Sequence, residues 1–523
     1  MSKSSAILIL IEGEGLLKGF SNSGQVEVYE SPSSSRSFSF GSSFMNVAVP
    51  ERSIDLFGSG GFGTASFSVS SQDLSIASLV GSGISIKGLK CTIKNYQEDM
   101  YWSEAPLLFS GFVSSASFDP YSEVVDVSLK SEEQSVNTQF PSSRVGDKGR
   151  FESPPSNTFD RILPVVYGSV INMPVPAVSF EHSASGAGTV RVCVAAHNVY
   201  GSPDRQGFVK IGNNELGDMS AWYEIKSDVD GLGQPYSFIS IPLELWDDGI
   251  YVREMSGKVT SSGSRLEGLG DIVQDIWSSY SQYNPEAFDS ARSSFATTKL
   301  NMFSVGISFT DASEGQTLFD LLVGRLGDLP FSFSAPIGLF GWDATVIPSE
   351  SEPRSGKLQF GVNIFERGEI KIEGYDKIQN RFKVSFSYDN NSEGNTESII
   401  IDETNSGLCR TSQSRYGKSK VREISAPDVV TPFSVGALIS AEVNKFAVPR
   451  LSMSYYTDDL SFLKKPLLTV FDVTDEDAGI FDQPFFLESV SHDVDNDGCF
   501  LALRSIKSID STLQGEHTNA KNS

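Results

Sequence analysis

The sequence predicts a mainly β, multidomain protein, and three observations support this prediction. The chain has 523 residues with 39% hydrophobic content, and because a single core stops growing near ~250–300 residues, several domains are expected. Phe is abundant, with 36 residues, whereas Lys and Arg total only 41, which favours half-buried strands over long solvated helices. Runs that alternate apolar and polar residues recur along most of the chain, and such alternation is typical of strands with one solvent-exposed face.

Residues 1–140 are predicted to form the first β domain. Its runs alternate with a period of two, and Asp119-Pro120 lies between two of them, as expected for a hairpin turn. A barrel or a sandwich follows from this pattern. The alternating apolar residues are Ala65, Phe67 and Val69, then Leu89, Cys91 and Ile93, and then Val125, Val127 and Leu129.

Residues 141–265 are predicted to contain a linker and a second β domain. Pro141, Gly146 and Pro154-Pro155 interrupt regular pairing over residues 141–160, which indicates the linker. Alternation resumes at Val190, Val192 and Val194. Residues 161–265 are therefore expected to be strands.

Residues 266–348 are predicted to form a small α+β domain. Asp271 can cap a helix that places Ile272, Val273, Ile276, Trp277 and Tyr280 on one stripe. Ser313 and Gln316 have capping-box spacing before a second helix, which Gly327 would end. We expect both helices to pack on a small sheet that includes residues 344–347.

Residues 349–510 return to strands, with one helix near residues 434–447 that Pro449 ends. Residues 511–523 lack apolar periodicity and are predicted to be a flexible tail. The end of this region repeats the pattern that ends the first domain: the hairpin of residues 109–113 and 124–130 is matched by residues 485–490 and 499–505. The chain is therefore predicted to hold two similar β-barrels.

The net charge of −25, from 66 acidic against 41 basic residues, gives no electrostatic basis for a nucleic-acid-binding groove. Either the acidic surface serves solubility, or it forms a wall past which DNA slides.

Four dispersed cysteines have no metal-site spacing and are expected to be buried thiols. The apolar run of residues 6–11 is too short for a signal peptide, and no segment reaches the ~20 apolar residues of a membrane span. The protein is expected to stay soluble in the cytoplasm until it assembles.

Two motifs suggest ligand sites, but their context favours turns. Residues 58–63 match GxGxxG, yet the following residues 64–70 are predicted as a strand, whereas phosphate binding needs a helix there. Asp493, Asp495, Asp497 and Gly498 resemble the start of a calcium loop, but position twelve is Arg504 instead of a bidentate Glu. A hairpin turn at residues 496–498 explains the same residues.

Catalytic chemistry is not expected. Cys193 and His197 would be too far apart in an extended run to form a nucleophile–base pair. Asp247-Asp248 would point to opposite faces of a strand, so a pair of carboxylates flanking a sugar bond is not expected there. We therefore predict no enzyme activity, with no catalytic, metal or cofactor-binding residues.

In their order along the chain, five segments resemble the tail hub proteins of long-tailed bacteriophages and gene transfer agents. One departure is Phe471-Asp472, where that family often has Gly-Asp, and residues 180–265 match poorly. The segments are LFSGFV at 108–113 with 124–129, ILPVVYGSV at 162–170, the helical stretches 271–280 (with Asn284-Pro285 and Phe288) and 313–327, NRFKVSFSYD at 380–389, and the closing strands 449–455, 467–473 and 485–503.

The resemblance implies two tube-like β-barrels per chain, at residues 1–140 and 349–510, and a homotrimeric ring that joins a sixfold tail tube to a threefold tip. Its implied partners are the tail tube or distal tail protein, tip or fibre proteins, and DNA that passes without specific binding. The implied location is the virion tail, assembled in the host cytoplasm. Two alternatives stay open: a tail-associated glycoside hydrolase or peptidase, and a carbohydrate-binding module that uses Trp102 or Trp222 for stacking.

Overall fold

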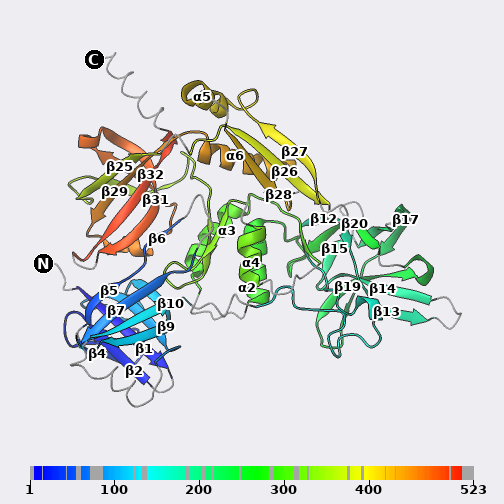
Figure 1. Ribbon diagram of the computed structural model, residues 1–523, viewed down its shortest axis with the longest axis horizontal. Coiled ribbons are helices and arrows are strands. Elements are labelled where there is room, and N and C mark those ends of the chain that lie inside the picture. The colour runs from blue at the N-terminus through cyan, green and yellow to red at the C-terminus, as the bar shows by residue number, and fades with distance from the viewer. Residues whose placement is uncertain are drawn as a thin grey trace.

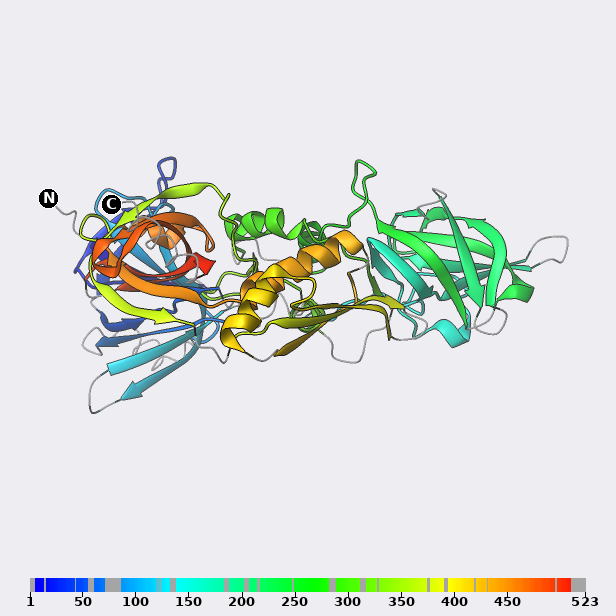
Figure 2. The same cartoon turned by 90° about the horizontal axis from the view of Figure 1, so that it is seen from above.

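The chain is mainly β and is built from several sheets around separate hydrophobic cores. Figure 1 shows the order of the parts, and Figure 2 shows that the first and last sheets lie at one end of the molecule, opposite the sandwich of residues 169–258. The computed structural model describes residues 5–508 except 14–15, 43, 55–60, 71–85, 120, 122–123, 132–137, 183–187, 202–206, 214–216, 247–248, 282–287, 311–316, 327–328, 374–376, 390–393, 418–419, 430 and 494–495.

The first unit is a nine-stranded sheet in the order β3-β4-β2-β1-β8-β9-β10-β7-β5. Its alternating residues form strands because one face covers a core that includes Phe67, Ile93, Phe109 and Val127. Its strands are β1 (Ser5–Gly13), β2 (Leu16–Ser21), β3 (Val26–Tyr29), β4 (Ser37–Ser42), β5 (Phe44–Ala48), β7 (Thr64–Ser70), β8 (Lys90–Gln97), β9 (Leu107–Asp119) and β10 (Val124–Lys130).

The last unit is a sheet in the order β24-β30-β31-β32-β29-β25, and the short strand β6 (Arg52–Ser53) also pairs with its β31. Phe486, Val490, Leu501 and Leu503 fill its core. Short 3-10 turns lie at Leu460–Lys464 (η5) and Glu476–Ala478 (η6). Its strands are β24 (Arg354–Gln359), β25 (Arg367–Ile372), β29 (Arg450–Thr457), β30 (Val470–Asp475), β31 (Ile480–Asp493) and β32 (Gly498–Ser508).

Five strands of the first unit and five of the last share one topology. Their spatial orders are β8-β9-β10-β7-β5 and β30-β31-β32-β29-β25, every neighbouring pair is antiparallel, and the strands follow each other along the chain in the same succession. Among the described residues both sheets have open edges, β3 and β5 in the first and β24 and β25 in the last, so no strand pair closes a barrel.

Between residues 169 and 258 two sheets form the sandwich unit, with orders β12-β20-β16-β17 and β13-β14-β19-β18. Val192, Val209, Ile239 and Val252 lie in the core between them. Strand β15 pairs with β20, and a 3-10 turn lies at Leu243–Leu245 (η2). The strands are β12 (Ser169–Pro174), β13 (Ala177–His182), β14 (Gly188–Ala195), β15 (Val199–Gly201), β16 (Phe208–Asn213), β17 (Gly217–Glu224), β18 (Lys226–Val229), β19 (Pro235–Pro242) and β20 (Ile250–Lys258).

The central unit combines helices with small sheets around the largest core, which includes Ile276, Trp342, Phe382 and Leu438. None of the described helices is long and apolar enough to cross a membrane. The elements are α2 (Leu269–Tyr280), α3 (Ser290–Leu300), α4 (Leu318–Asp320) with a π-helical turn (Leu321–Arg325), α5 (Gly407–Tyr416) and α6 (Pro432–Phe446), and the strands β11 (Val165–Tyr167), β21 (Ile307–Phe309), β22 (Phe331–Ser334), β23 (Gly341–Ala344), β26 (Arg381–Asp389), β27 (Gly394–Ile401) and β28 (Val421–Ala426).

The central unit differs from the sequence prediction in two ways. Residues 380–389 were expected within the second tube-like region, but β26 pairs with β27 and β28 and not with the last sheet. The reason is that Phe382, Val384 and Phe386 bury their side chains in the central core, beside α6. The helices α3 and α5 were not predicted, because few apolar residues mark a stripe on either of them.

The helix N-caps are also different residues from those predicted. The N-cap of α2 is Gly268, and Asp271 lies inside the first turn. The capping box of α4 is made by Thr317 and Asp320, while the expected Ser313, Gln316 and Gly327 lie outside the described residues. The helix predicted at 434–447 is confirmed as α6, which begins at Pro432.

The segment 141–160 does not behave as a free linker. Val145 is fully buried, and it packs with Leu163 and with Cys193 and Phe238 of the sandwich unit. The backbone N–H of Gly231 donates to the carbonyl of Arg150, and Arg150 pairs with the buried Asp230. Prolines and glycines therefore interrupt strand pairing here while the chain still covers a core.

Candidate functional site

The first and last units contact each other through β6, which is the candidate functional site of the chain. Ser53 and Arg52 pair antiparallel with Ser489 and Val490 of β31, and the backbone N–H of Ile54 donates to the carbonyl of Glu488 at 3.0 Å. Figure 1 shows β6 leaving the first unit and running alongside the last. A strand from one unit therefore extends the sheet of the other.

Arg52 holds this contact together. Its guanidinium donates to the carbonyl of Leu463 at 2.7 Å and to the carbonyl of Lys465, and Arg52 is 8% exposed. Leu463 packs against the cores of both units. Lys464 donates in turn to the carbonyl of Glu104 in the first unit. The η5 segment is thus bound to the first unit by hydrogen bonds on both sides of an apolar contact.

A second group of contacts joins β1 and β8 of the first sheet to the β31–β32 hairpin. The Asn95 amide nitrogen lies 2.6 Å from His492 Nε2 and 3.2 Å from Asp497 Oδ1. The Ser5 hydroxyl donates to the same Asp497 oxygen at 2.5 Å. Burial lowers the pKa of His492, although Asp497 and Asp493 act to raise it. A neutral imidazole can accept from the Asn95 amide, so this contact suits neutral pH.

No sequence pattern indicated these interface residues. Strand β6 has only two residues, too few for any periodicity, and Arg52 resembles any polar residue in a turn. Only a pairing partner more than 400 positions away explains why Arg52 is buried. The alternation of the β31 and β32 residues did predict the hairpin that receives it.

The described parts of the two motifs that resembled ligand sites belong to strands, a β-bridge and a turn. Strand β7 begins at Thr64, directly after Gly63, which confirms the predicted strand; residues 58–60 lie outside the described residues. Asp493 pairs with Gly498, which confirms the hairpin. The Asp493 carboxylate accepts from Asn496, and Arg504 forms ion pairs with Glu488 and Glu373.

Cys193 and His197 have separate structural roles. Cys193 is fully buried in β14, and burial raises its pKa to about 12. The His197 Nε2 atom accepts from the Val166 backbone N–H at 2.9 Å, while Nδ1 donates to the carbonyl of Asn198 at 3.1 Å. The imidazole is thereby fixed as a neutral tautomer. The four cysteines, at 91, 193, 409 and 499, are all buried and free, as predicted.

Acid should weaken the sandwich unit through His197. Burial lowers the pKa of His197 from 6.5 to about 4, so between these values the unfolded chain binds a proton that the folded chain does not. The contribution of neutral His197 to the free energy of unfolding is therefore complete above pH 6.5. It falls by roughly 3 kcal/mol as the pH decreases from 6.5 towards 4. Denaturation at several pH values should show this slope, and His197→Gln, which cannot titrate, should flatten it. An equal slope in both proteins would contradict the assignment.

The tryptophans proposed for sugar stacking are in packed positions. Trp102 is buried against Phe38 and Phe40, with Lys94 over its ring. Trp222 is half-buried beneath the ammonium of Lys210. Trp102 therefore offers no open ring face of the kind a sugar needs.

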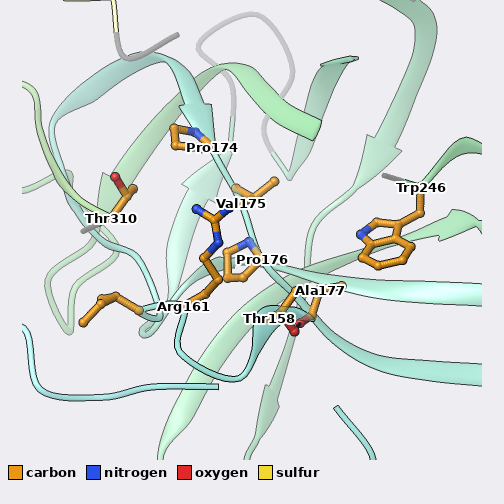
Figure 3. A pocket seen from close by; sticks show the side chains of 9 residues that line it. Thr158, Arg161, Pro174, Val175, Pro176, Ala177, Trp246 and Thr310 are labelled. Atoms are coloured by element: carbon orange, nitrogen blue, oxygen red, sulfur yellow. Dashed lines mark hydrogen bonds between the residues drawn. The ribbon is translucent and has the colours of Figure 1, made fainter. Parts of the chain in front are cut away.

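A small pocket lies beside Trp246 of the sandwich unit (Figure 3), while the acidic pair 247–248 lies outside the described residues. Pro174, Pro176 and Arg161 are among its lining residues, and its volume of about 30 Å³ is enough for water but not for a sugar ring. The Trp246 ring contacts Phe180 edge-on at 5.5 Å.

A larger cleft of about 340 Å³ lies where the sandwich unit meets the central unit. Arg150, His197, Lys258 and Tyr280 are among its lining residues, and none of the described lining residues is a carboxylate. Glycoside hydrolysis requires two carboxyl groups beside the scissile bond. This cleft therefore does not supply the groups that the glycosidase alternative needs.

The sequence matches no protein-family model, and a search of curated proteins gives no match. Solved structures similar to the chain include a tail protein from Neisseria meningitidis MC58, with 9% identity, a TM-score of 0.38 and 96% of each chain covered. The 43 kDa tail protein of prophage MuSo2 from Shewanella oneidensis has 10% identity and a TM-score of 0.38, with 96% of this chain and 98% of that chain covered. A chain of a native gene transfer agent virion has 9% identity and a TM-score of 0.39, with 72% and 89% covered.

Proposed function

We propose that this chain is a structural tail hub of a bacteriophage, in which three copies form a ring that joins a sixfold tail tube to a threefold tip. The supporting observation is the repeated five-strand topology of the first and last units. Three copies of a chain with two such units supply six related sheets around one axis. A threefold assembly can then meet a sixfold tube without a symmetry mismatch.

The contact between the two units supports this arrangement. Because β6 extends the sheet of the last unit, the two units are held side by side within one chain. The ring needs a fixed relative orientation of neighbouring units, since a free hinge between them would leave the curvature of the ring undefined. Arg52, Asn95 and His492 are the residues to which we assign this role.

The charge of the chain agrees with passage of DNA through the ring. A net charge of −25 means that a surface with the chain's average composition repels phosphate. DNA would then move through without being held. The tail tube or distal tail protein on one side and tip or fibre proteins on the other are the partners that this role requires, in the virion tail after assembly in the host cytoplasm.

The trimer can be tested directly. We expect native mass spectrometry of the purified chain to give the mass of three copies, and negative-stain images to give rings with six peripheral densities. A chain that remains monomeric at every concentration, alone and with its tube protein, would contradict the proposal. So would turnover of peptidoglycan or capsular polysaccharide that is abolished by replacing a single carboxylate.

A further inference from the structure

The closing hairpins of the first and last units can be aligned residue by residue. In the first, Val113 lies opposite Leu129 and the next pair is Ser115 with Ser128, so Ser114 is skipped. In the last, Leu487 lies opposite Leu503 and the next pair is Ser489 with Ala502, so Glu488 is skipped. The connections, residues 120–123 and 494–497, have equal length. Ser115, Ala116 and Phe118 therefore correspond to Ser489, Val490 and His492.

These corresponding positions differ in what covers them. In the last unit β6 pairs with Ser489 and Val490, and Val490 and His492 are 1% and 9% exposed. In the first unit, residues 115–118 are all exposed, and Phe118 is 51% exposed.

The backbone edge at residues 115–118 is also open. Strand β8 pairs with β9 only from Leu107 to Phe112, and among the described residues β10 is the only strand that pairs with β9 from Ser115 onwards. Figure 2 shows the β9–β10 hairpin extending away from the rest of its unit. An open strand edge with an exposed aromatic side chain favours addition of a strand from another chain.

We propose that residues 115–118 of β9 are the docking surface for the last unit of a second copy of this chain. Within one chain, the first unit covers the β31 edge of the last. Across copies, the last unit of one chain would cover the matching β9 edge of the next, and this head-to-tail contact closes after three copies. The inference rests on the proposed trimer and adds the surface that builds it.

Cross-linking from position 118 tests the surface. The photo-reactive analogue benzoylphenylalanine would replace Phe118, and isotope-labelled and unlabelled chains would be mixed before irradiation. We expect cross-links between differently labelled chains that end within the last unit, at residues 354–372 or 450–508. The same analogue at Val229, an exposed β18 residue of the sandwich unit, is the control and should give no such link.

A charge at the same position tests the energetics. Phe118→Lys should raise the concentration at which trimers dissociate by roughly tenfold or more, because a buried unpaired ammonium is unfavourable. Val229→Lys should leave it unchanged, and circular dichroism would check that both variants fold. Trimers that tolerate Phe118→Lys and cross-link elsewhere would overturn the inference while the proposed trimer stands. A wild-type chain that never forms trimers would overturn both.

Discussion

Replacing Asp343 with alanine is expected to destabilise the central unit by about 3–5 kcal/mol, because it leaves the buried Arg292 guanidinium without its counter-ion. Arg292 in α3 and Asp343 in β23 are 7% and 6% exposed. Arg292 Nε lies 3.0 Å from each carboxylate oxygen, and Nη1 donates to the carbonyl of Ser334 at 3.2 Å. The adjacent Trp342 should report the transition by its fluorescence during urea unfolding.

Two further variants separate this effect from general damage. The double variant Arg292→Met with Asp343→Ala should recover much of the loss, since no charge is then left unpaired in the core. Glu423→Ala removes an exposed partner of Lys383 in the same unit, and it should leave the transition unchanged. If Asp343→Ala alone unfolds at the wild-type urea concentration, the ion pair does not hold α3 against the sheet.

Local pattern was enough to predict much of the secondary structure. The strand at Val124–Lys130 and the hairpin at Asp493–Gly498 follow from alternation and turn residues, and α6 follows from its apolar spacing and from Pro449 beyond its end. Each of these signals is contained within about fifteen residues. Burial of the four cysteines needed only their spacing and their apolar character.

What the sequence could not predict depends on partners far along the chain. The pattern of Phe382, Val384 and Phe386 indicates a strand, but nothing local says that the strand belongs to the central core. Helix α3 is held by the Asp289 cap and by the Arg292–Asp343 pair. Neither interaction produces a helical periodicity of apolar residues in the sequence. For the candidate site, the receiving hairpin was predictable, while Arg52 and Asn95 were not.

Arg52→Ala is expected to separate the first unit from the last, because it leaves the carbonyls of Leu463 and Lys465 without their donor inside a buried contact. Hydrogen bonds from a charged donor contribute about 1.5–3 kcal/mol each, so the loss should be about 3 kcal/mol or more. Amide hydrogen exchange should accelerate at Ile54 and along Ser489–Val490, and exchange in β14 of the sandwich unit should not change.

The conservative variant Arg52→Lys makes the test specific. Lysine keeps the charge but lacks the planar fork that reaches both carbonyls, so exchange at Ile54 should be intermediate between wild type and Arg52→Ala. Unchanged exchange in Arg52→Ala would show that strand pairing alone joins the units. If instead the units separate, the same variant should no longer form rings. The reason is that the fixed relative orientation of the two units within each chain sets the curvature of the ring.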